Sequence, residues 1–218
     1  MGAAMQEKTG ATLDRRALTR GATWTVPVMM VGSVAPATAA SRCPQLSGTA
    51  SGWTTTATGL DCTAGQGTSG YVTNWNNSPP AALGSGFSFT SGCNARTTGP
   101  ATVTTTTTIN VVAGVTYSFD QLIIGAGYGN NNANTSVLQT IRVSIGGTQI
   151  FYGATRSTTG ATTLRIGASQ AYNTSGTTFQ PTTSGSVTVT IAFTMPATTS
   201  TRPASDDISI RLPVLTCR

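Results

Sequence analysis

The sequence predicts an all-β protein: a single jelly-roll-type β-sandwich of about 8–10 antiparallel strands that follows an N-terminal signal peptide. Three observations lead to this prediction. Apolar and polar residues alternate along many short segments, as they do on strands with one face in a core. Only 8% of the 218 residues are charged, and Thr, Ser, Asn and Gly are abundant. No segment shows the sustained period of an amphipathic helix.

Residues 1–40 have the features of an export signal. A basic region precedes a weakly apolar, uncharged stretch that ends in the small residues Ala37-Thr38-Ala39. We expect cleavage before Ala40 or Ser41, which leaves residues 41–218 as one domain. Gly, Thr and Pro dilute the apolar stretch too much for a membrane-spanning helix, so we expect no transmembrane anchor in the mature form.

The arginine pair Arg15-Arg16 in "LDRRALTRG" resembles a twin-arginine signal, in particular those of exported actinobacterial cell-envelope proteins. Asp14 and Leu18 depart from the usual pattern, and an ordinary Sec signal is the alternative. On either route we expect a bacterial protein that is secreted or associated with the cell envelope.

The charge pattern argues against nucleic acid as a partner. Four of the 12 basic and two of the 6 acidic residues lie in the first 40 positions, which leaves eight arginines and four aspartates in the mature part. These arginines are scattered along the chain. No run of them could follow a phosphate backbone.

The threonine-rich segment 102–120, "TVTTTTTINVVAGVTYSFD", alternates in the manner of two strands. Val103, Ile109 and Val111 fall on one face, and the alternation resumes after Ala113-Gly114 with Val115, Tyr117 and Phe119. Threonine is β-branched and suits a pleated surface, whereas a solvated Thr-rich spacer would show no alternation. Because Gly114 can form a tight turn, we predict a hairpin.

Further segments carry strand signals between turn residues. In 136–153 the alternation of Ile141, Val143 and Ile145 is followed by Gly146-Gly147, which predicts a two-residue hairpin. In 206–215 Ile208, Ile210, Leu212 and Val214 share a face, with Pro213 opposite and near an exposed edge. The other predicted strands lie in 52–60, 69–77, 84–92, 162–167 and 184–195.

The four cysteines all follow the signal, and an even number in an exported chain predicts two disulfides. Three connectivities are open. Because chain ends often lie close together in compact domains, we favour Cys43–Cys217, which leaves Cys62–Cys93.

The residue inventory argues against an enzyme. The chain contains no histidine, which excludes a Ser-His-Asp triad, a Cys-His pair and a histidine-based zinc site. Glycoside hydrolysis commonly needs two carboxyl groups on either side of the scissile bond. Asp206 and Asp207 are adjacent, so on a strand they would point to opposite faces.

Asp206 and Asp207 also have two non-catalytic interpretations. They can cap the entry of a strand by accepting backbone hydrogen bonds. Alternatively, they can bind a structural calcium together with loop carbonyls, since Ca²⁺ prefers oxygen ligands. No other cofactor is expected.

Aromatic residues outside the clear core alternation are candidates for stacking on sugar rings. These residues are Trp53, Trp75, Tyr128, Tyr152 and Tyr172. We single out Tyr128, Trp75 and Tyr172, together with the loop amides of Asn131 and Asn132. The alternative is that Trp53 and Trp75 are core residues of early strands.

Four stretches together resemble carbohydrate-binding-module-like jelly rolls of the galactose-binding-domain type: "VVAGVTYSF", "IRVSIGGTQIF", "FQPTTSGSVTVTIAFTM" and "DDISIRLPVLTC". The resemblance covers residues 103–217. It implies a β-sandwich fold, often with a structural calcium, and binding of a cell-envelope or environmental glycan.

Two function classes follow. The first is a non-catalytic exported β-sandwich that binds glycan at or near the cell envelope. The second is a structural or protein-interaction component of the cell surface without a small ligand, whose hydroxyl-rich faces serve solubility or packing.

Overall fold

The computed structural model describes residues 43–61, 69–72, 88–91, 94–95, 99–126, 138–174, 176–197 and 208–218. Within these residues the chain forms strands and one short 3₁₀ turn, η1 (Ala50–Gly52). The predicted signal, with Arg15 and Arg16, lies outside the described residues.

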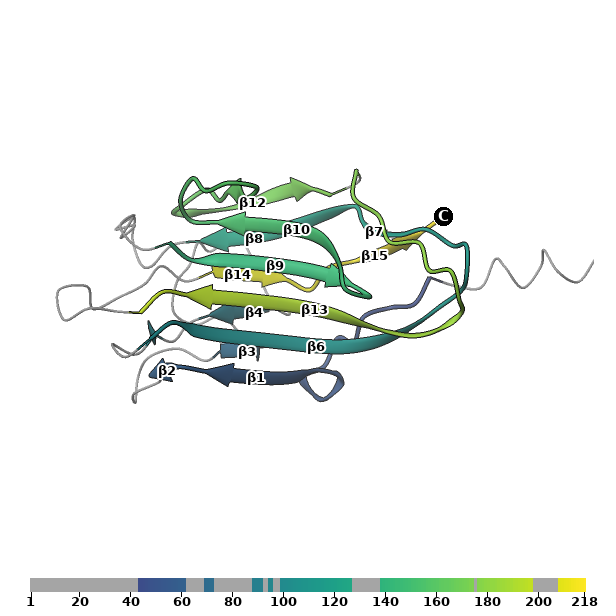
Figure 1. Ribbon diagram of the computed structural model, residues 1–218, viewed down its shortest axis with the longest axis horizontal. Helices are drawn as coiled ribbons and strands as arrows, with labels where there is room; N and C mark the ends of the chain where they lie inside the picture. Colours follow the sequence, from purple (N-terminus) through teal and green to yellow (C-terminus); the bar gives the residue numbers. More distant parts are fainter. Residues whose placement is uncertain are drawn as a thin grey trace, which may run out of the picture. The chain divides into compact units, whose positions relative to one another are not determined.

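Two sheets carry most of the strands (Figure 1). The six-stranded sheet has the order β1 (Thr54–Thr58), β6 (Ala101–Val111), β13 (Gly185–Met195), β9 (Thr140–Ile145), β10 (Thr148–Ala154) and β11 (Thr162–Thr163). The five-stranded sheet has the order β12 (Ala168–Asn173), β8 (Gln121–Ala126), β14 (Ile208–Arg211), β4 (Ser88–Ser91) and β3 (Ser69–Val72). Two small sheets pair β15 (Leu215–Cys217) with β7 (Tyr117–Phe119), and β2 (Leu60–Asp61) with β5 (Asn94–Ala95).

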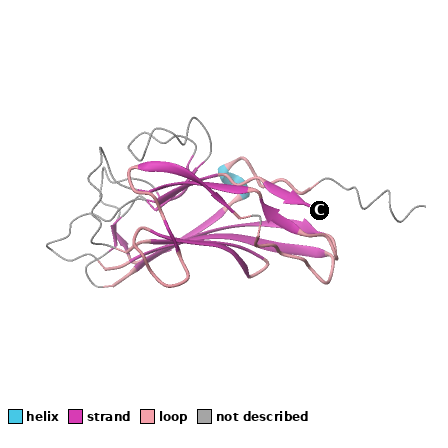
Figure 2. Cartoon of the chain, turned by 90° about the horizontal axis from the view of Figure 1, so that it is seen from above, coloured by secondary structure: helices cyan, strands magenta, loops and turns pink. Residues whose placement is uncertain are grey.

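The order of the strands is that of a jelly roll. Along the chain β4, β8, β12 and β14 enter the five-stranded sheet, while β6, β9, β10 and β13 enter the other. The chain therefore crosses repeatedly between two layers, which Figure 2 shows one above the other. Among the named strands only β10 and β11 pair in parallel. The predicted all-β sandwich is confirmed.

The core lies between these layers and follows the alternation of the sequence. In β6 Val103, Ile109 and Val111 are buried, and in β13 Ile191 and Phe193 are buried. The facing sheet contributes buried side chains from β8 and β14, namely Leu122, Ile124, Ile208 and Ile210. Burial of such apolar faces is the main stabilising contribution in a sandwich of this kind.

The predicted hairpin in 102–120 is wrong, although both of its strands and its turn exist. Gly114 has φ 79° and turns the chain, but β7 then pairs with β15 and not with β6. The reason is that β6 already has β1 on one edge and β13 on the other. No edge of β6 remains for β7, so the chain leaves the sheet after Val111.

The hairpin predicted at Gly146-Gly147 is confirmed. Both glycines have positive φ, 56° and 82°, and they join β9 to β10 in antiparallel pairing. The interpretation of 206–215 is wrong beyond Arg211. Pro213 is buried and Val214 is 65% exposed, because the strand ends at Arg211 and the chain reverses its faces before β15.

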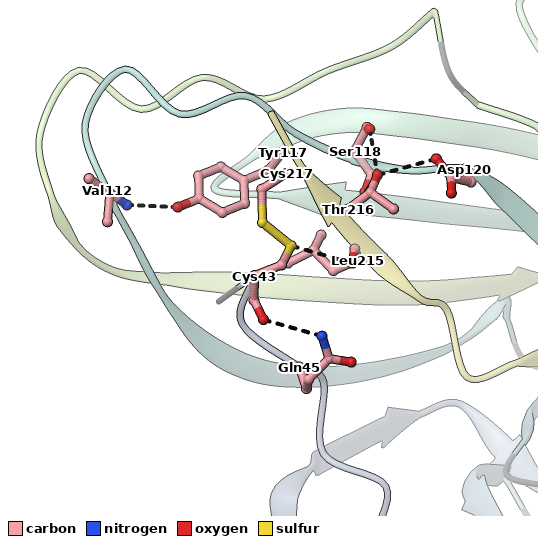
Figure 3. Close-up of a disulfide and its surroundings, with 9 residues drawn as sticks. All are labelled: Cys43, Gln45, Val112, Tyr117, Ser118, Asp120, Leu215, Thr216 and Cys217. Carbon is pink, nitrogen blue, oxygen red and sulfur yellow. Dashed lines mark hydrogen bonds between the residues drawn. A yellow bond between two sulfur atoms is a disulfide. The ribbon is translucent and has the colours of Figure 1, made fainter. Parts of the chain in front are cut away.

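The disulfide Cys43–Cys217 is present, with Cα atoms 5.6 Å apart (Figure 3). The Cys43 sulfur lies 3.4 Å from the Leu215 carbonyl oxygen, which is a contact and not a hydrogen bond because a disulfide sulfur has no proton. Next to it β15 pairs with β7, and Thr216 and Ser118 share a hydroxyl–hydroxyl hydrogen bond of 3.0 Å. Cys62 and Cys93 lie outside the described residues, so Cys62–Cys93 stays a prediction.

No helix within the described ranges has the length and apolar character needed to cross a membrane.

Candidate functional site

A groove of about 520 Å³ lies where an edge of each large sheet meets the other. One wall is β10, which pairs with β11 through Gly153 and Ala154. Among the described strands, none pairs with residues 149–152 on that side. The other wall is β12, the edge strand of the five-stranded sheet. The lining is completed by residues that flank these strands. Thr174, Gly176 and Thr177 follow β12, Gly160 precedes β11, and Thr162 is the first residue of β11.

Two aromatic rings join these walls beneath the groove. Phe151 of β10 and Tyr172 of β12 pack with ring centroids 5.5 Å apart and tilted by 49°. Both rings are buried, at 7% exposure each. Aromatic pairs at this distance stabilise beyond their buried area, so the contact fixes the two edges relative to one another.

The Tyr172 hydroxyl is part of the same support. It accepts a hydrogen bond of 2.8 Å from the backbone N–H of Arg165. Burial raises the pKa of the Tyr172 hydroxyl, and the Arg165 N–H and the Arg165 charge oppose this only in part. The hydroxyl therefore keeps its proton at neutral pH.

Tyr152 differs from this pair because its ring is partly exposed and lines the groove. The guanidinium carbon of Arg142 lies 4.4 Å from the centre of the ring, in a cation–π contact. The two residues are opposite each other on β9 and β10, which places them side by side on the outer face of the sheet. The contact restricts the ring and leaves its second face uncovered by the guanidinium.

The polar lining consists of amides and hydroxyls. Gln149, Gln170 and Asn173 supply amides, and all three are exposed. Within the described part of the chain, the side-chain amides of Gln149 and Gln170 have no hydrogen-bond partner. An amide offers both donors and an acceptor, as sugar hydroxyls do, and the lining includes no charged residue.

The structure places one of the predicted ligand-binding residues in this groove, but not as predicted. Tyr172 is at its base with a buried ring, so the expectation that Tyr172 is exposed for stacking is wrong. The strand pattern explains this, because Tyr172 shares the inward face of β12. Trp53 is buried at 8% exposure and donates its Nε1–H to the Ser47 carbonyl at 2.8 Å, as its core interpretation requires.

The remaining predicted site residues lie outside the described residues: Trp75, Tyr128, Asn131, Asn132, Asp206 and Asp207. Their proposed roles stay predictions. Among the residues that the structure describes, no group of three or more His, Cys, Asp or Glu side chains could hold a metal ion.

Sequence reasoning missed the groove itself. It named Tyr152 among the aromatic candidates but not Gln149, Gln170 or Asn173. β12 was not predicted as a strand, so nothing in the sequence indicated that "SQAYN" lies beside "QIFY". The available signal was weak: a single aromatic residue, Tyr172, follows the turn at Gly167, whose φ is 77°.

No protein-family model matches the chain, and no curated protein matches it either. Among solved structures, it is similar to carbohydrate-binding modules of the β-sandwich superfamily, with 14% identity over 78% of this chain and 58% of that chain, and a TM-score of 0.40. A family 61 carbohydrate-binding module in complex with β-1,4-galactotriose matches with 11% identity over 78% and 92% of the two chains, and a TM-score of 0.37.

A third match is the enzymatically active domain of tailspike protein 4 from bacteriophage CBA120, with 18% identity over 78% of this chain and 20% of that chain, and a TM-score of 0.30. The first of the three matches is longer than the aligned region, since this chain covers 58% of it. A shared sandwich architecture hosts many unrelated functions, so these matches do not identify a function for this chain.

Proposed function

We propose that the protein is a non-catalytic, exported β-sandwich that binds an uncharged glycan in the groove between β10 and β12, at or near the bacterial cell envelope. The observation that carries this proposal is the lining of the groove: a partly exposed Tyr152 ring held by Arg142, with uncharged amides and hydroxyls around it. Aromatic rings stack on the apolar faces of pyranose rings, and amides bind the hydroxyl groups.

The lining also supports binding without catalysis. None of the described residues that line the groove has a carboxyl side chain, and the chain contains no histidine. Hydrolysis of a glycosidic bond commonly requires a carboxyl pair at the scissile bond. Among the described lining residues, a sugar held in this groove would therefore meet hydrogen-bonding groups but no carboxyl group.

Export is supported by two features of the chain. The first 40 residues carry the composition of a signal, and the Cys43–Cys217 disulfide is of a kind that persists in oxidising compartments. Calcium at Asp206 and Asp207 remains part of the proposal as a structural, not a ligand-binding, element.

Affinity electrophoresis tests the proposal: the migration of the protein is compared in native gels with and without a neutral polysaccharide. Tyr152→Ala should weaken binding about tenfold or more, equivalent to about 1.4 kcal/mol, because the stacking surface is lost. Tyr152→Phe should keep most of the affinity. Thr182→Ala, at an exposed position outside the groove, is the matched control.

Because the lining is uncharged, we expect affinity to change little between low and physiological salt. If Tyr152→Ala and Thr182→Ala migrate alike in every polysaccharide that retards the wild type, the groove is not the glycan site. If no polysaccharide retards the wild type, the structural or protein-interaction role stands instead.

A further inference from the structure

Threonine occupies most of the outward positions of three adjacent strands in the six-stranded sheet, although Ala192 interrupts the series on β13. The sequence shows the pattern in β1 as "TTTAT", in β6 as "TVTTTTT" and in β13 as "TVTIAFT". Alternate residues of a strand share a face. The intervening residues Val103, Val189, Ile191 and Phe193 are buried, so these threonines point away from the core.

The strand register aligns these threonines into rows across the sheet. One row joins Thr54, Thr106 and Thr190, and a second joins Thr58, Thr102 and Thr194. Between them Thr56 and Thr104 continue to Ala192. The second row extends to Thr140 on β9. We call this set the threonine face; its members are Thr54, Thr56, Thr58, Thr102, Thr104, Thr106, Thr108, Thr140, Thr188, Thr190 and Thr194.

The threonine face is a regular lattice. Neighbouring strands lie about 4.8 Å apart, and alternate residues of a strand are about 6.7 Å apart. In Figure 1 β1, β6, β13 and β9 lie side by side, each antiparallel to the next. The backbone positions that carry these threonines therefore repeat at similar intervals along and across the strands.

The side chains of the face are also held in place. Threonine is β-branched, which restricts χ1, and neighbours across the sheet crowd each other further. The hydroxyls of Thr58 and Thr102 are hydrogen-bonded at 2.8 Å. Binding through such side chains loses little conformational entropy.

The chemistry of the face excludes most macromolecular partners. On the outward positions of β1, β6 and β13 there is no charged residue and no large apolar or aromatic residue. A protein interface has an apolar or aromatic core, and an anionic polymer needs cations. On the neighbouring strand β9, Arg142 lies opposite Ala192 on the same side of the sheet, and its guanidinium contacts the Tyr152 ring.

We propose that the threonine face binds ice. A rigid, uncharged lattice of hydroxyls and methyls suits a ligand that itself repeats in two dimensions, and hexagonal ice exposes planar lattices of oxygen atoms with repeats of this size. Each hydroxyl can occupy the position of a lattice water. Because the crystal engages many threonines at once, contacts that are weak individually add to firm adsorption.

A crystalline polysaccharide is the competing regular surface. Polysaccharide surfaces are held by exposed aromatic rings, and Tyr152, which lies at the β10 side, is the one such ring described on this sheet's outer face. Ice binding by the threonine face does not depend on glycan binding in the groove, because the two sites use different residues.

Two measurements on the full-length protein test the proposal. The first is inhibition of ice recrystallisation, and the second is the difference between the freezing and the melting temperature of a single ice crystal. We expect the wild type to slow recrystallisation and to shape the crystal. Thr104→Tyr and Thr190→Tyr should abolish both effects, because a protruding ring holds the lattice away from the ice. Thr182→Tyr, at an exposed position off the face, should leave them unchanged.

Thermal melting of each variant shows whether it is folded, so that a loss of ice activity can be distinguished from a loss of structure. Tyrosine suits strands, so we expect the melting temperature to stay near that of the wild type. If Thr104→Tyr lowers it, Thr188→Tyr at an exposed position of β13 replaces it. Tyr152→Ala should retain the ice activity, which separates this site from the groove.

Two results would overturn the proposal. The first is a wild-type protein with no effect on recrystallisation or crystal shape. The second is an effect that survives both Thr104→Tyr and Thr190→Tyr in folded protein. Loss of retention on crystalline cellulose in these variants, without any ice activity in the wild type, would assign the face to polysaccharide instead.

Discussion

Tyr152 and Tyr172 line the same groove, yet their surroundings give them different roles. The Tyr172 ring is buried against Phe151, and its hydroxyl is bound to the Arg165 N–H. The Tyr152 ring is partly exposed and held by Arg142. Removing Tyr172 should therefore affect stability, whereas removing Tyr152 should affect binding.

Tyr172→Phe tests the structural role at the level of a single hydroxyl. The substitution leaves the Arg165 N–H without its acceptor, so we expect a loss of about 1 kcal/mol in the free energy of unfolding at neutral pH. Glycan retention should change much less than it does in Tyr152→Ala. Urea denaturation of the two proteins measures the difference.

The pH dependence provides a second readout of Tyr172. Because burial raises the pKa of Tyr172 in the folded protein, the unfolded chain loses this proton first as the pH rises. This contribution to stability is present below the ordinary tyrosine pKa of about 10 and is lost above it. The stability of Tyr172→Phe should fall less steeply between pH 9 and pH 11 (roughly the range of tyrosine ionisation). Parallel curves for both proteins would contradict the assignment.

At the scale of elements, the β9–β10 hairpin positions one wall of the groove. Its turn depends on two glycines with positive φ, but their surroundings differ. A Cβ at Gly146 would lie 2.6 Å from the Phe179 ring, whereas a Cβ at Gly147 would meet nothing within 4 Å. The centroid of the Phe179 ring also lies 6.4 Å from that of the Tyr117 ring, so a shift of Phe179 would disturb this second contact.

The two glycine positions form a matched pair for mutagenesis. Gly146→Ala and Gly147→Ala both place a side chain at positive φ, which costs about 1–2 kcal/mol each. Gly146→Ala should cost about 1 kcal/mol more, because Phe179 has to move. Chemical denaturation gives both values. An equal loss for the two variants would mean that the turn, and not Phe179, determines the cost.

The sequence predicted those elements whose faces alternate cleanly and whose turns carry glycine. β6, β13 and the β9–β10 hairpin are of this kind. It predicted the wrong partner for β7, because pairing depends on which sheet edges are free. The sequence did not predict β8, because "QLIIGA" does not alternate and is buried on both faces at Gly125 and Ala126. It also did not predict β12, because "ASQAYN" has no regular alternation of apolar and polar residues.

The groove could not be predicted for a related reason. Its residues come mainly from β10 and β12, strands of different sheets, and no local pattern records which strands of two sheets meet. Tyr152 was among the aromatic candidates, but its contact with Arg142 could not be predicted, because Arg142 belongs to the neighbouring strand. The threonine repeats were visible in the sequence, but their alignment into rows follows only from the strand register.

At the scale of the whole molecule, the Cys43–Cys217 disulfide ties the start of the domain to its last strand across a sequence separation of 174 residues. The backbone N–H of Arg218 also donates to the Thr116 carbonyl at 3.0 Å, and Thr116 donates to the Arg218 carbonyl at 2.9 Å. The end of the chain is therefore fixed by both covalent and hydrogen bonds.

Removing this disulfide should lower the free energy of unfolding substantially. In the chain-entropy treatment, a loop of this length contributes about 5 kcal/mol through restriction of the unfolded chain. Cys43→Ala/Cys217→Ala should retain the sandwich at low temperature but melt earlier, as circular dichroism would record. A melting temperature equal to that of the wild type would show that the hydrogen bonds of β7 and β15 suffice.

Glycan binding in the groove is the central claim, and amide chemical shifts during titration with a neutral oligosaccharide test it most directly. We predict saturable shifts in Gln149–Tyr152 of β10 and Gln170–Asn173 of β12, with the signals of the threonine face unchanged. Tyr152→Ala should remove these shifts without altering the rest of the spectrum. Saturable shifts confined to other strands, or no saturable shifts with any neutral oligosaccharide, would contradict the account.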